Sequence, residues 1–126
     1  MPAQIEVAIV EDETDTAEML AEMMRLNGYY VQLYHGAQTA IFALQRHRPS
    51  IVILDVMMPD ISGLEVLRHI RRDPHLHTIP VIILSAKSTP PEIQEGLDAG
   101  ADLYLTKPIT FKELKAAVEQ VLAASA

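Results

Sequence analysis

The sequence predicts an α/β fold of the (βα)5 type, in which five parallel strands form a doubly wound sheet with helices on both faces. The first observation is that short apolar runs alternate five times with longer stretches of helical periodicity. The second is that these runs are rich in β-branched residues and bounded by turn residues, which is typical of buried strands. Strands that alternate with helices form right-handed crossovers, so the sheet is expected to be parallel.

The strands are predicted from the apolar runs themselves. Ile51-Val52-Ile53-Leu54 is the clearest, because it is apolar throughout and Asp55 follows it directly. An unbroken run of this length indicates a strand that is covered on both faces. The predicted strands are residues 5–10, 30–34, 51–54, 81–84 and 103–105.

The first predicted helix follows the first strand. Thr14 or Asp15 is expected to be its N-cap, and Asn27-Gly28 is expected to end it. Apolar residues recur at i, i+3 and i+7, so one face of this helix is expected to enter the core. The residues concerned are Ala17, Leu20 and Met24, with Met19 and Met23 also expected in or near the core.

Four more helices are predicted after the later strands. The second covers about 37–46 and ends before Pro49, and the third covers about 63–72 and is closed by Asp73-Pro74. The fourth, about 91–99, has proline in its first turn and ends at Gly100. The last covers about 111–123 and is expected to bury Leu114, Val118, Val121 and Leu122.

The composition is that of one globular domain. The chain has 126 residues, 49% of them apolar, so residues 1–126 are expected to form a single domain with its core at about 5–122 and no effector domain. The absence of cysteine excludes disulfides and suits a reducing compartment. The start of the sequence has no signal-peptide pattern, and no apolar run approaches the roughly 20 residues that span a bilayer. A cytoplasmic protein without membrane contact is therefore expected.

The charge balance argues against direct binding to nucleic acid. The chain has 10 basic and 17 acidic residues, a net charge of −7, whereas affinity for nucleic acid comes largely from basic residues that neutralise phosphates. Arg68, Arg71 and Arg72 form a small basic group on the third helix and are expected to face solvent.

Carboxylates follow two of the predicted strands. Asp55 comes directly after the third strand and Glu11-Asp12 after the first. If these strands are neighbours, the carboxylates meet at the edge of the sheet where open α/β folds place their sites. A cation would relieve their repulsion, and oxygen ligands suit Mg²⁺. Alternatively, Glu11 and Asp12 only begin the first helix, where acids suit its dipole, and Asp55 only caps a turn.

A hydroxyl and a cation follow two later strands. Ser85 comes after the fourth strand and could approach an oxyanion held by Asp55. Lys107 follows the fifth strand and supplies the positive charge that clustered carboxylates, or a phosphoryl group on one of them, would require. Each of these two residues could be an ordinary loop residue, but their occurrence at successive strand ends favours a functional site.

Together these stretches resemble the receiver domain of bacterial two-component response regulators, the CheY-like family. The resemblance covers about residues 5–121 and implies a flavodoxin-like three-layer sandwich with strand order 2-1-3-4-5. The matching stretches are Val10-Glu11-Asp12-Glu13, Leu54-Asp55-Val56-Met57-Met58-Pro59 with Gly63, residues 79–86, Gly100-Ala101-Asp102, Tyr104 and Thr106-Lys107-Pro108.

The resemblance implies a role for each site residue. Asp55 would be the phospho-acceptor, a nucleophile that takes a phosphoryl group from phosphohistidine. Glu11, Asp12, Asp55 and the backbone carbonyl of Met57 would hold Mg²⁺, or Mn²⁺ in its place. Lys107 would pair with the phosphoryl oxygens, Ser85 would hydrogen-bond the phosphoryl group, Tyr104 would turn inward, and the bond before Pro108 would be cis.

The implied function is a phosphorylation-dependent switch whose partners are a sensor histidine kinase or phosphotransfer protein and a downstream effector. Its chemistry would be limited to self-catalysed phosphorylation and dephosphorylation. One alternative is a pseudo-receiver that never carries phosphate. Another is a small aspartyl-phosphate hydrolase, which the sequence disfavours because Met57 stands where such enzymes have a second Asp.

Two further patterns bear on partners and metals. A phosphorylation-dependent homodimer is one possible output. One branch of the family pairs its receivers through a charged network, but the positions that would be basic are Ile93, Glu95, Ala117 and Glu119 here, and Leu103 replaces an expected acid. His69, His75 and His77 lie away from the carboxylates, so solvated histidines are expected rather than a metal site.

Overall fold

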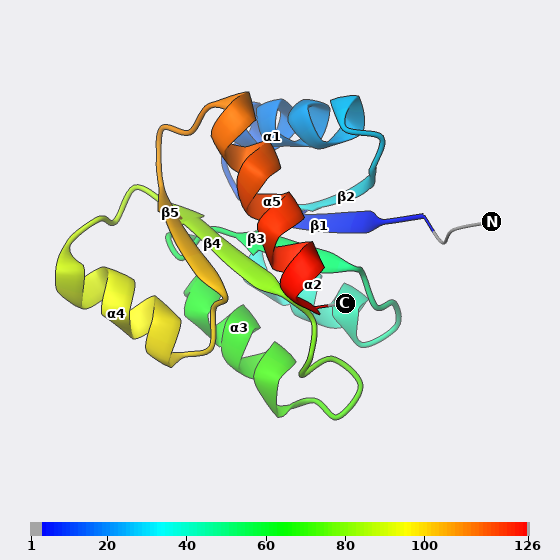
Figure 1. Ribbon diagram of the computed structural model, residues 1–126. Helices are drawn as coiled ribbons and strands as arrows, with labels where there is room; N and C mark the ends of the chain where they lie inside the picture. The colour runs from blue at the N-terminus through cyan, green and yellow to red at the C-terminus, as the bar shows by residue number, and fades with distance from the viewer. Residues whose placement is uncertain (1–3, 126) are drawn as a thin grey trace.

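The computed structural model describes residues 4–125, which form a five-stranded parallel sheet between two layers of helices (Figure 1). The sheet order is β2-β1-β3-β4-β5. The strands are β1 Glu6–Val10, β2 Tyr30–Tyr34, β3 Ile51–Leu54, β4 Val81–Ser85 and β5 Leu103–Thr106. The helices are α1 Thr14–Leu26, α2 Ala37–Leu44, α3 Gly63–Arg72, α4 Pro90–Asp98 and α5 Phe111–Ser125.

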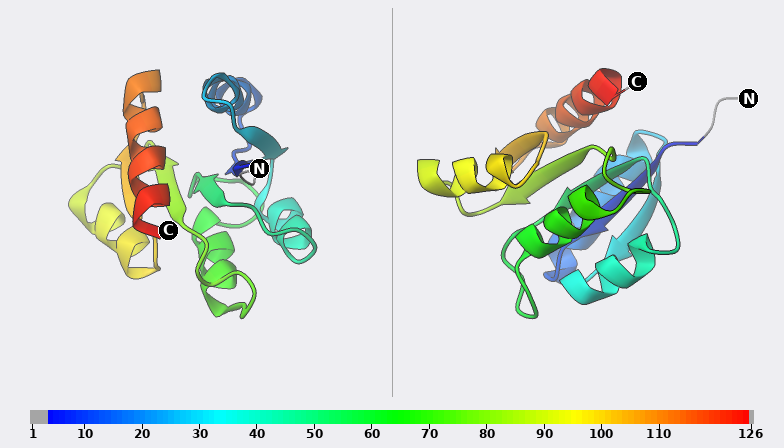
Figure 2. Two further views of the ribbon diagram at one scale, coloured as in Figure 1. Left: turned by 45° about the vertical axis from the view of Figure 1, so that its right-hand side comes forward. Right: turned by 90° about the horizontal axis from the view of Figure 1, so that it is seen from below.

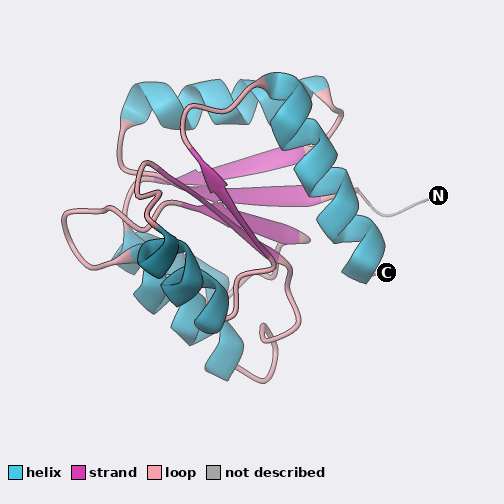
Figure 3. Cartoon of the chain, turned by 60° about the vertical axis from the view of Figure 1, so that its left-hand side comes forward, coloured by secondary structure: helices cyan, strands magenta, loops and turns pink. Residues whose placement is uncertain are grey.

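The helices cover both faces of the sheet. Helices α1 and α5 lie on one face, and α2, α3 and α4 lie on the other (Figures 1 and 2). Coloured by secondary structure, the same arrangement appears as a helix–sheet–helix sandwich (Figure 3). The predicted (βα)5 fold and the strand order implied by the resemblance are therefore confirmed.

Alternate residues of the central strands supply two separate cores. In β3, Ile51 and Ile53 pack towards α1 and α5, whereas Val52 and Leu54 pack towards α2 and α3. All four side chains are almost fully buried. This burial on both faces explains why the central strands are continuous apolar runs instead of alternating patterns.

The helix boundaries agree with prediction to within one or two residues, except for the cap of α1. The predicted N-caps Thr14 and Asp15 are wrong, because the carboxylate of Glu13 is the cap and accepts hydrogen bonds from the N–H groups of Asp15, at 3.2 Å, and Thr16, at 2.6 Å. A carboxylate can cap a helix in this way as well as a hydroxyl can. Helix α4 begins at Pro90, one residue before its predicted start, with Thr89 as its N-cap.

Four predictions about burial are also wrong. Arg71 does not face solvent: it donates hydrogen bonds to the carbonyls of His77, Ile79 and Gly100 and to the carboxylate of Asp102. Met19 is 46% exposed, although its neighbour Met24 is buried, and Leu122 is only partly buried. His69 is not fully solvated either, since its Nε2 is buried and has no hydrogen-bond partner among residues 4–125, whereas His75 and His77 are exposed.

The parallel sheet determines where a site can form. All five strands run in the same direction, so Val10, Leu54, Ser85 and Thr106 end at the same edge, and Val10 is paired with Leu54. The residues that follow these ends are therefore brought together from distant parts of the chain. Between residues 4 and 125, no helix is both long and apolar enough to cross a membrane.

Candidate functional site at the carboxyl edge of the sheet

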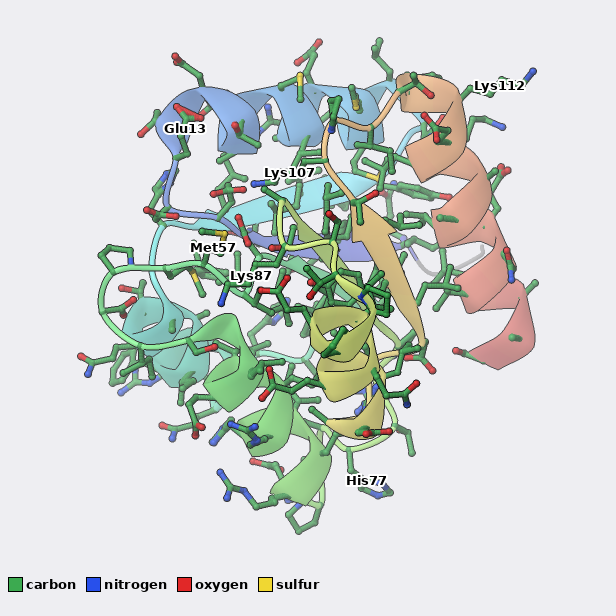
Figure 4. The ribbon with its side chains drawn as sticks, turned by 90° about the vertical axis from the view of Figure 1, so that its left-hand side faces the viewer. Glu13, Met57, His77, Lys87, Lys107 and Lys112 are labelled. Atoms are coloured by element: carbon green, nitrogen blue, oxygen red, sulfur yellow. The ribbon has the colours of Figure 1, made fainter. Side chains whose placement is uncertain are left out.

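The site is formed by two carboxylates and one ammonium group at the carboxyl edge of the sheet. Glu11 follows β1, Asp55 follows β3 and Lys107 follows β5. The Lys107 ammonium donates hydrogen bonds to both carboxylates, and its Nζ lies 2.7 Å from Asp55 Oδ2. Figure 4 looks onto this edge, with Lys107 above Met57 and Lys87. The acids that follow β1 and β3 thus share one cation, which follows β5.

Asp55 is held in a fixed orientation. Its backbone N–H donates to the Val10 carbonyl at 3.0 Å, which extends the pairing of β1 and β3 by one residue. Its two carboxylate oxygens accept separate bonds: Oδ1 from the Met57 N–H at 2.9 Å, and Oδ2 from Lys107. Only 5% of the residue is exposed. A carboxylate that is this buried and oriented suits a reaction at one defined oxygen.

Glu11 is buried even more completely, with 2% exposed. It accepts hydrogen bonds from Lys107 and, at 3.1 Å, from the Glu13 N–H. Burial raises the pKa of the Glu11 carboxyl, and the bond from Lys107 offsets this only in part. Glu11 therefore does more than begin the first helix, because its carboxylate is part of the buried charge cluster.

Lys107 is the only cation hydrogen-bonded to these two carboxylates within residues 4–125. Burial alone lowers the pKa of Lys107, but the hydrogen bonds to Asp55 and Glu11 outweigh it, and the pKa is raised. The ammonium therefore remains charged at neutral pH. Its backbone is fixed by an N–H bond to the Ser85 carbonyl at 2.9 Å, and the Lys107–Pro108 peptide bond is cis.

Asp12 lies at the mouth of the site. It is partly exposed and lines an open depression of about 500 Å³ together with Met57 and Lys87. The donor chemistry fits Mg²⁺, because Glu11, Asp12 and Asp55 offer only hard oxygen ligands beside an open space that water can fill. In the described part of the chain, no three acidic or histidine side chains are gathered as a metal cluster, and the ammonium bridges two of the predicted ligands.

Ser85 and Tyr104 are linked through the backbone of Lys87. Ser85 is fully buried, and its hydroxyl accepts a hydrogen bond from the Lys87 N–H at 3.2 Å. The Tyr104 hydroxyl donates to the Lys87 carbonyl at 2.7 Å. Burial raises the pKa of Tyr104, so this hydroxyl stays protonated and can act as the donor. The two predicted switch residues are thus connected by one intervening peptide segment.

Gly63 is a site residue whose importance depends on close packing. A Cβ at Gly63 would lie 2.0 Å from the carbonyl oxygen of Asp55 and 2.7 Å from the Leu54 side chain. Only glycine allows α3 to begin this close to the end of β3. The sequence contained Gly63 as part of a motif, but its contact with the Asp55 backbone could be seen only in the folded chain.

The comparisons with known proteins agree with this geometry. A sequence model of the response regulator receiver domain matches residues 7–119. The chain belongs to the response regulator receiver domain family. Response regulator MprA from Mycobacterium tuberculosis is 37% identical over 118 residues, which are 94% of this chain and 50% of MprA. This receiver domain thus spans about half the length of that relative.

Solved receiver domains have the same fold. The receiver domain of the Francisella response regulator 1452 superimposes with a TM-score of 0.89 at 28% identity, covering 98% of this chain and 100% of the other. The receiver domain of sensor histidine kinase PA1611 from Pseudomonas aeruginosa PAO1 gives 0.89 at 27% identity, covering 96% and 99%. The latter structure has a magnesium ion coordinated in its active site cleft.

The structure brings most of the predicted site residues of this receiver domain together. Glu11, Asp55 and Lys107 are in direct contact, and Ser85 is joined to the same edge through its carbonyl. Sequence reasoning missed the link from Lys87 to Glu92 of α4, whose charged atoms lie 3.9 Å apart. Their spacing of five residues across a loop gave no helical signal that could have revealed the pair.

Proposed function

We propose that this receiver domain is a phosphorylation-dependent switch in which Asp55 accepts a phosphoryl group from a histidine kinase or a phosphotransfer protein. The observation that carries the proposal is the buried Asp55 carboxylate, which is 5% exposed and hydrogen-bonded to the Lys107 ammonium. A carboxylate that is buried and oriented beside a cation is suited to act as the nucleophile in phosphoryl transfer.

The transfer uses one oxygen of Asp55 and one cation. A carboxylate oxygen attacks phosphorus as the bond from phosphorus to the donor's imidazole nitrogen breaks, and the phosphoryl group becomes an acyl phosphate. The Met57 N–H holds Oδ1, and Lys107, already bonded to Oδ2, stabilises the charge on the phosphoryl oxygens. Such reactions depend mainly on positioning and charge stabilisation.

Glu11, Asp12, Asp55 and the backbone carbonyl of Met57 would hold Mg²⁺, with Mn²⁺ as a substitute. When bound, the ion neutralises charge on the phosphoryl oxygens and orients the group that is transferred. The nearly full burial of Glu11 and Asp55 supports this assignment, because buried acids in one cluster need more positive charge than a single lysine provides.

The output is a change in the face formed by α4, β5 and α5. Ser85 would hydrogen-bond the new phosphoryl group, and Tyr104 would leave the Lys87 carbonyl and turn inward. The signal would pass to an effector domain or protein, or to a second copy of the chain, in the cytoplasm. MprA is about twice as long as this chain. We therefore propose that the effector lies in a separate segment or a separate protein.

The proposal is tested by treating the protein with acetyl phosphate and Mg²⁺ and measuring its intact mass. We expect the mass of one phosphoryl group to be added to the wild type and not to Asp55→Asn, which keeps the shape of the side chain. Omission of Mg²⁺ should abolish the addition. Equal modification of wild type and Asp55→Asn would contradict the assignment of the phospho-acceptor.

A further inference from the structure

Lys87 connects the phosphorylation site to the beginning of α4 by three contacts. Its N–H donates to the Ser85 hydroxyl and its carbonyl accepts from Tyr104, as described above. Its ammonium lies 3.9 Å from Oε2 of Glu92. Its side chain also lines the depression shared with Asp12 and Met57, and Figure 4 shows the labelled Lys87 and Met57 at the same edge of the sheet. One residue therefore borders both the acceptor site and the helix behind it.

Glu92 already has a structural role at the start of α4. Its Oε1 accepts hydrogen bonds from the N–H and the hydroxyl of Thr89, at 3.2 and 2.7 Å, while Thr89 Oγ1 accepts from the Glu92 N–H. This reciprocal capping box fixes the first turn of the helix. The other oxygen, Oε2, is the one that faces Lys87. The ion pair is thus attached directly to the cap of α4.

The ion pair between Lys87 and Glu92 is weak enough for the Lys87 ammonium to change partners. The side chains of Lys87 and Glu92 are 47% and 33% exposed, and their charged atoms lie near the upper limit of contact. Exposed pairs of this kind contribute little stability. A phosphoryl group carries nearly two negative charges and three acceptor oxygens, so it competes well with a single carboxylate for the same ammonium.

We propose that Lys87 is a further phosphoryl-binding residue, and that its ammonium leaves Glu92 for the phosphoryl group when Asp55 is modified. The proposal rests on the proposed function, since it requires a phosphoryl group on Asp55. The exchange releases Oε2 of Glu92 and loosens the capping box of α4. The Lys87 side chain is thereby a second connection from the site to α4, in addition to the contacts of Ser85 and Tyr104.

The test is a double-mutant cycle on the affinity for beryllofluoride, a mimic of the phosphoryl group. The affinity is measured by isothermal titration calorimetry in the presence of Mg²⁺. Lys87→Met should weaken binding by about five- to tenfold, the effect of one partly exposed charge-assisted hydrogen bond. Glu92→Gln keeps an acceptor for the capping box but lacks the charge, and should tighten binding by roughly two- to threefold because Lys87 is released. In the Lys87→Met background, Glu92→Gln should have no effect.

Glu95→Gln is the matched control, because Glu95 is an exposed acid on the same helix that has no ion pair with Lys87. It should change the affinity by less than about twofold. The proposal is overturned if Lys87→Met binds as tightly as the wild type, or if Glu92→Gln tightens binding equally in both backgrounds. Failure of the wild type itself to bind beryllofluoride would instead overturn the proposed function, and the exchange with it.

Hydrogen exchange provides a second readout. In the wild type, beryllofluoride should speed amide exchange in the first turn of α4, because Glu92 loses its partner. In Lys87→Met, the first turn should exchange equally fast with and without the mimic. An equal increase in both proteins would show that α4 responds without Lys87 and would contradict the exchange.

Discussion

The charge cluster predicts that Lys107→Met destabilises the protein strongly. The substitution keeps most of the apolar length of the side chain but leaves Glu11 and Asp55, 2% and 5% exposed, without their shared cation. Removing one partner of a buried ion pair costs about 3–5 kcal/mol. The Lys107 side chain retains 23% exposure, so we expect the lower end, about 3 kcal/mol, a large share of the roughly 5–15 kcal/mol that stabilises a domain.

The cost should depend on pH in a defined direction. Burial already raises the pKa of Glu11 above 4.5, and loss of the bond from Lys107 raises it further. An acid whose pKa is raised in the folded state contributes stability below its unfolded pKa, and this is lost as the pH rises through the folded value. The pKa of Lys107 is raised by its hydrogen bonds to Asp55 and Glu11, so the wild-type ammonium stays charged throughout the neutral range. The cost of the substitution should therefore grow between pH 5 and pH 8.

Urea denaturation, followed by circular dichroism in EDTA at both pH values, measures this cost. The matched control is Lys115→Met, which removes an exposed lysine 3.1 Å from Glu119 on α5 and should cost less than about 0.5 kcal/mol at either pH. Mg²⁺ should restore part of the stability lost in Lys107→Met, because it supplies the missing positive charge. A cost equal to that of the control, or one that does not change with pH, would refute the reasoning about the charge cluster.

Three further predictions concern the fold around the site. Gly63→Ala places a Cβ 2.0 Å from a carbonyl oxygen at the end of β3 and should cost about 3 kcal/mol or more in urea denaturation. Gly36→Ala, at the N-cap of α2, meets only the Asp60 carboxylate at 3.3 Å and should cost about 1 kcal/mol; equal costs would contradict the close-packing argument. Arg71→Met removes hydrogen bonds to three carbonyls and should cost about 2 kcal/mol in the same assay, against no cost if the side chain were merely solvated. Hydrogen bonds from Thr16 lower the pKa of Glu13, so the contribution of Glu13 to stability is present above pH 4.5 and lost in acid. The melting temperature of Glu13→Gln should lie below that of the wild type at pH 7 and approach it in acid. A difference that is the same at both pH values would rule out this linkage.

The sequence predicted the fold well because local and global signals agree in the central strands. Ile51 to Leu54 must be apolar on both faces, since one pair of side chains meets α1 and α5 and the other meets the opposite layer. The same topology explains why Glu11, Asp55 and Lys107 could be expected at one edge. Their positions at strand ends depend only on where each apolar run stops.

Contacts made by long side chains could not be predicted. Arg71 looked like a solvated residue because its partners, three backbone carbonyls and Asp102, come from loops that meet only after folding. Met19 shares the helical spacing of core residues but lies beside an open pocket near Pro108. The cap of α1 was also misplaced, because Glu13 reaches forward over the first turn with a longer side chain than the usual capping residues have.

Modification of Asp55 tests the central claim most directly. Peptide mass spectrometry, after brief treatment with acetyl phosphate and Mg²⁺ and reduction of the acyl phosphate with borohydride, locates the modified residue. The account predicts that Asp55 carries the modification and that Glu11 and Asp12 do not. Modification of another residue, or none under conditions where a known receiver domain is phosphorylated in parallel, would contradict it.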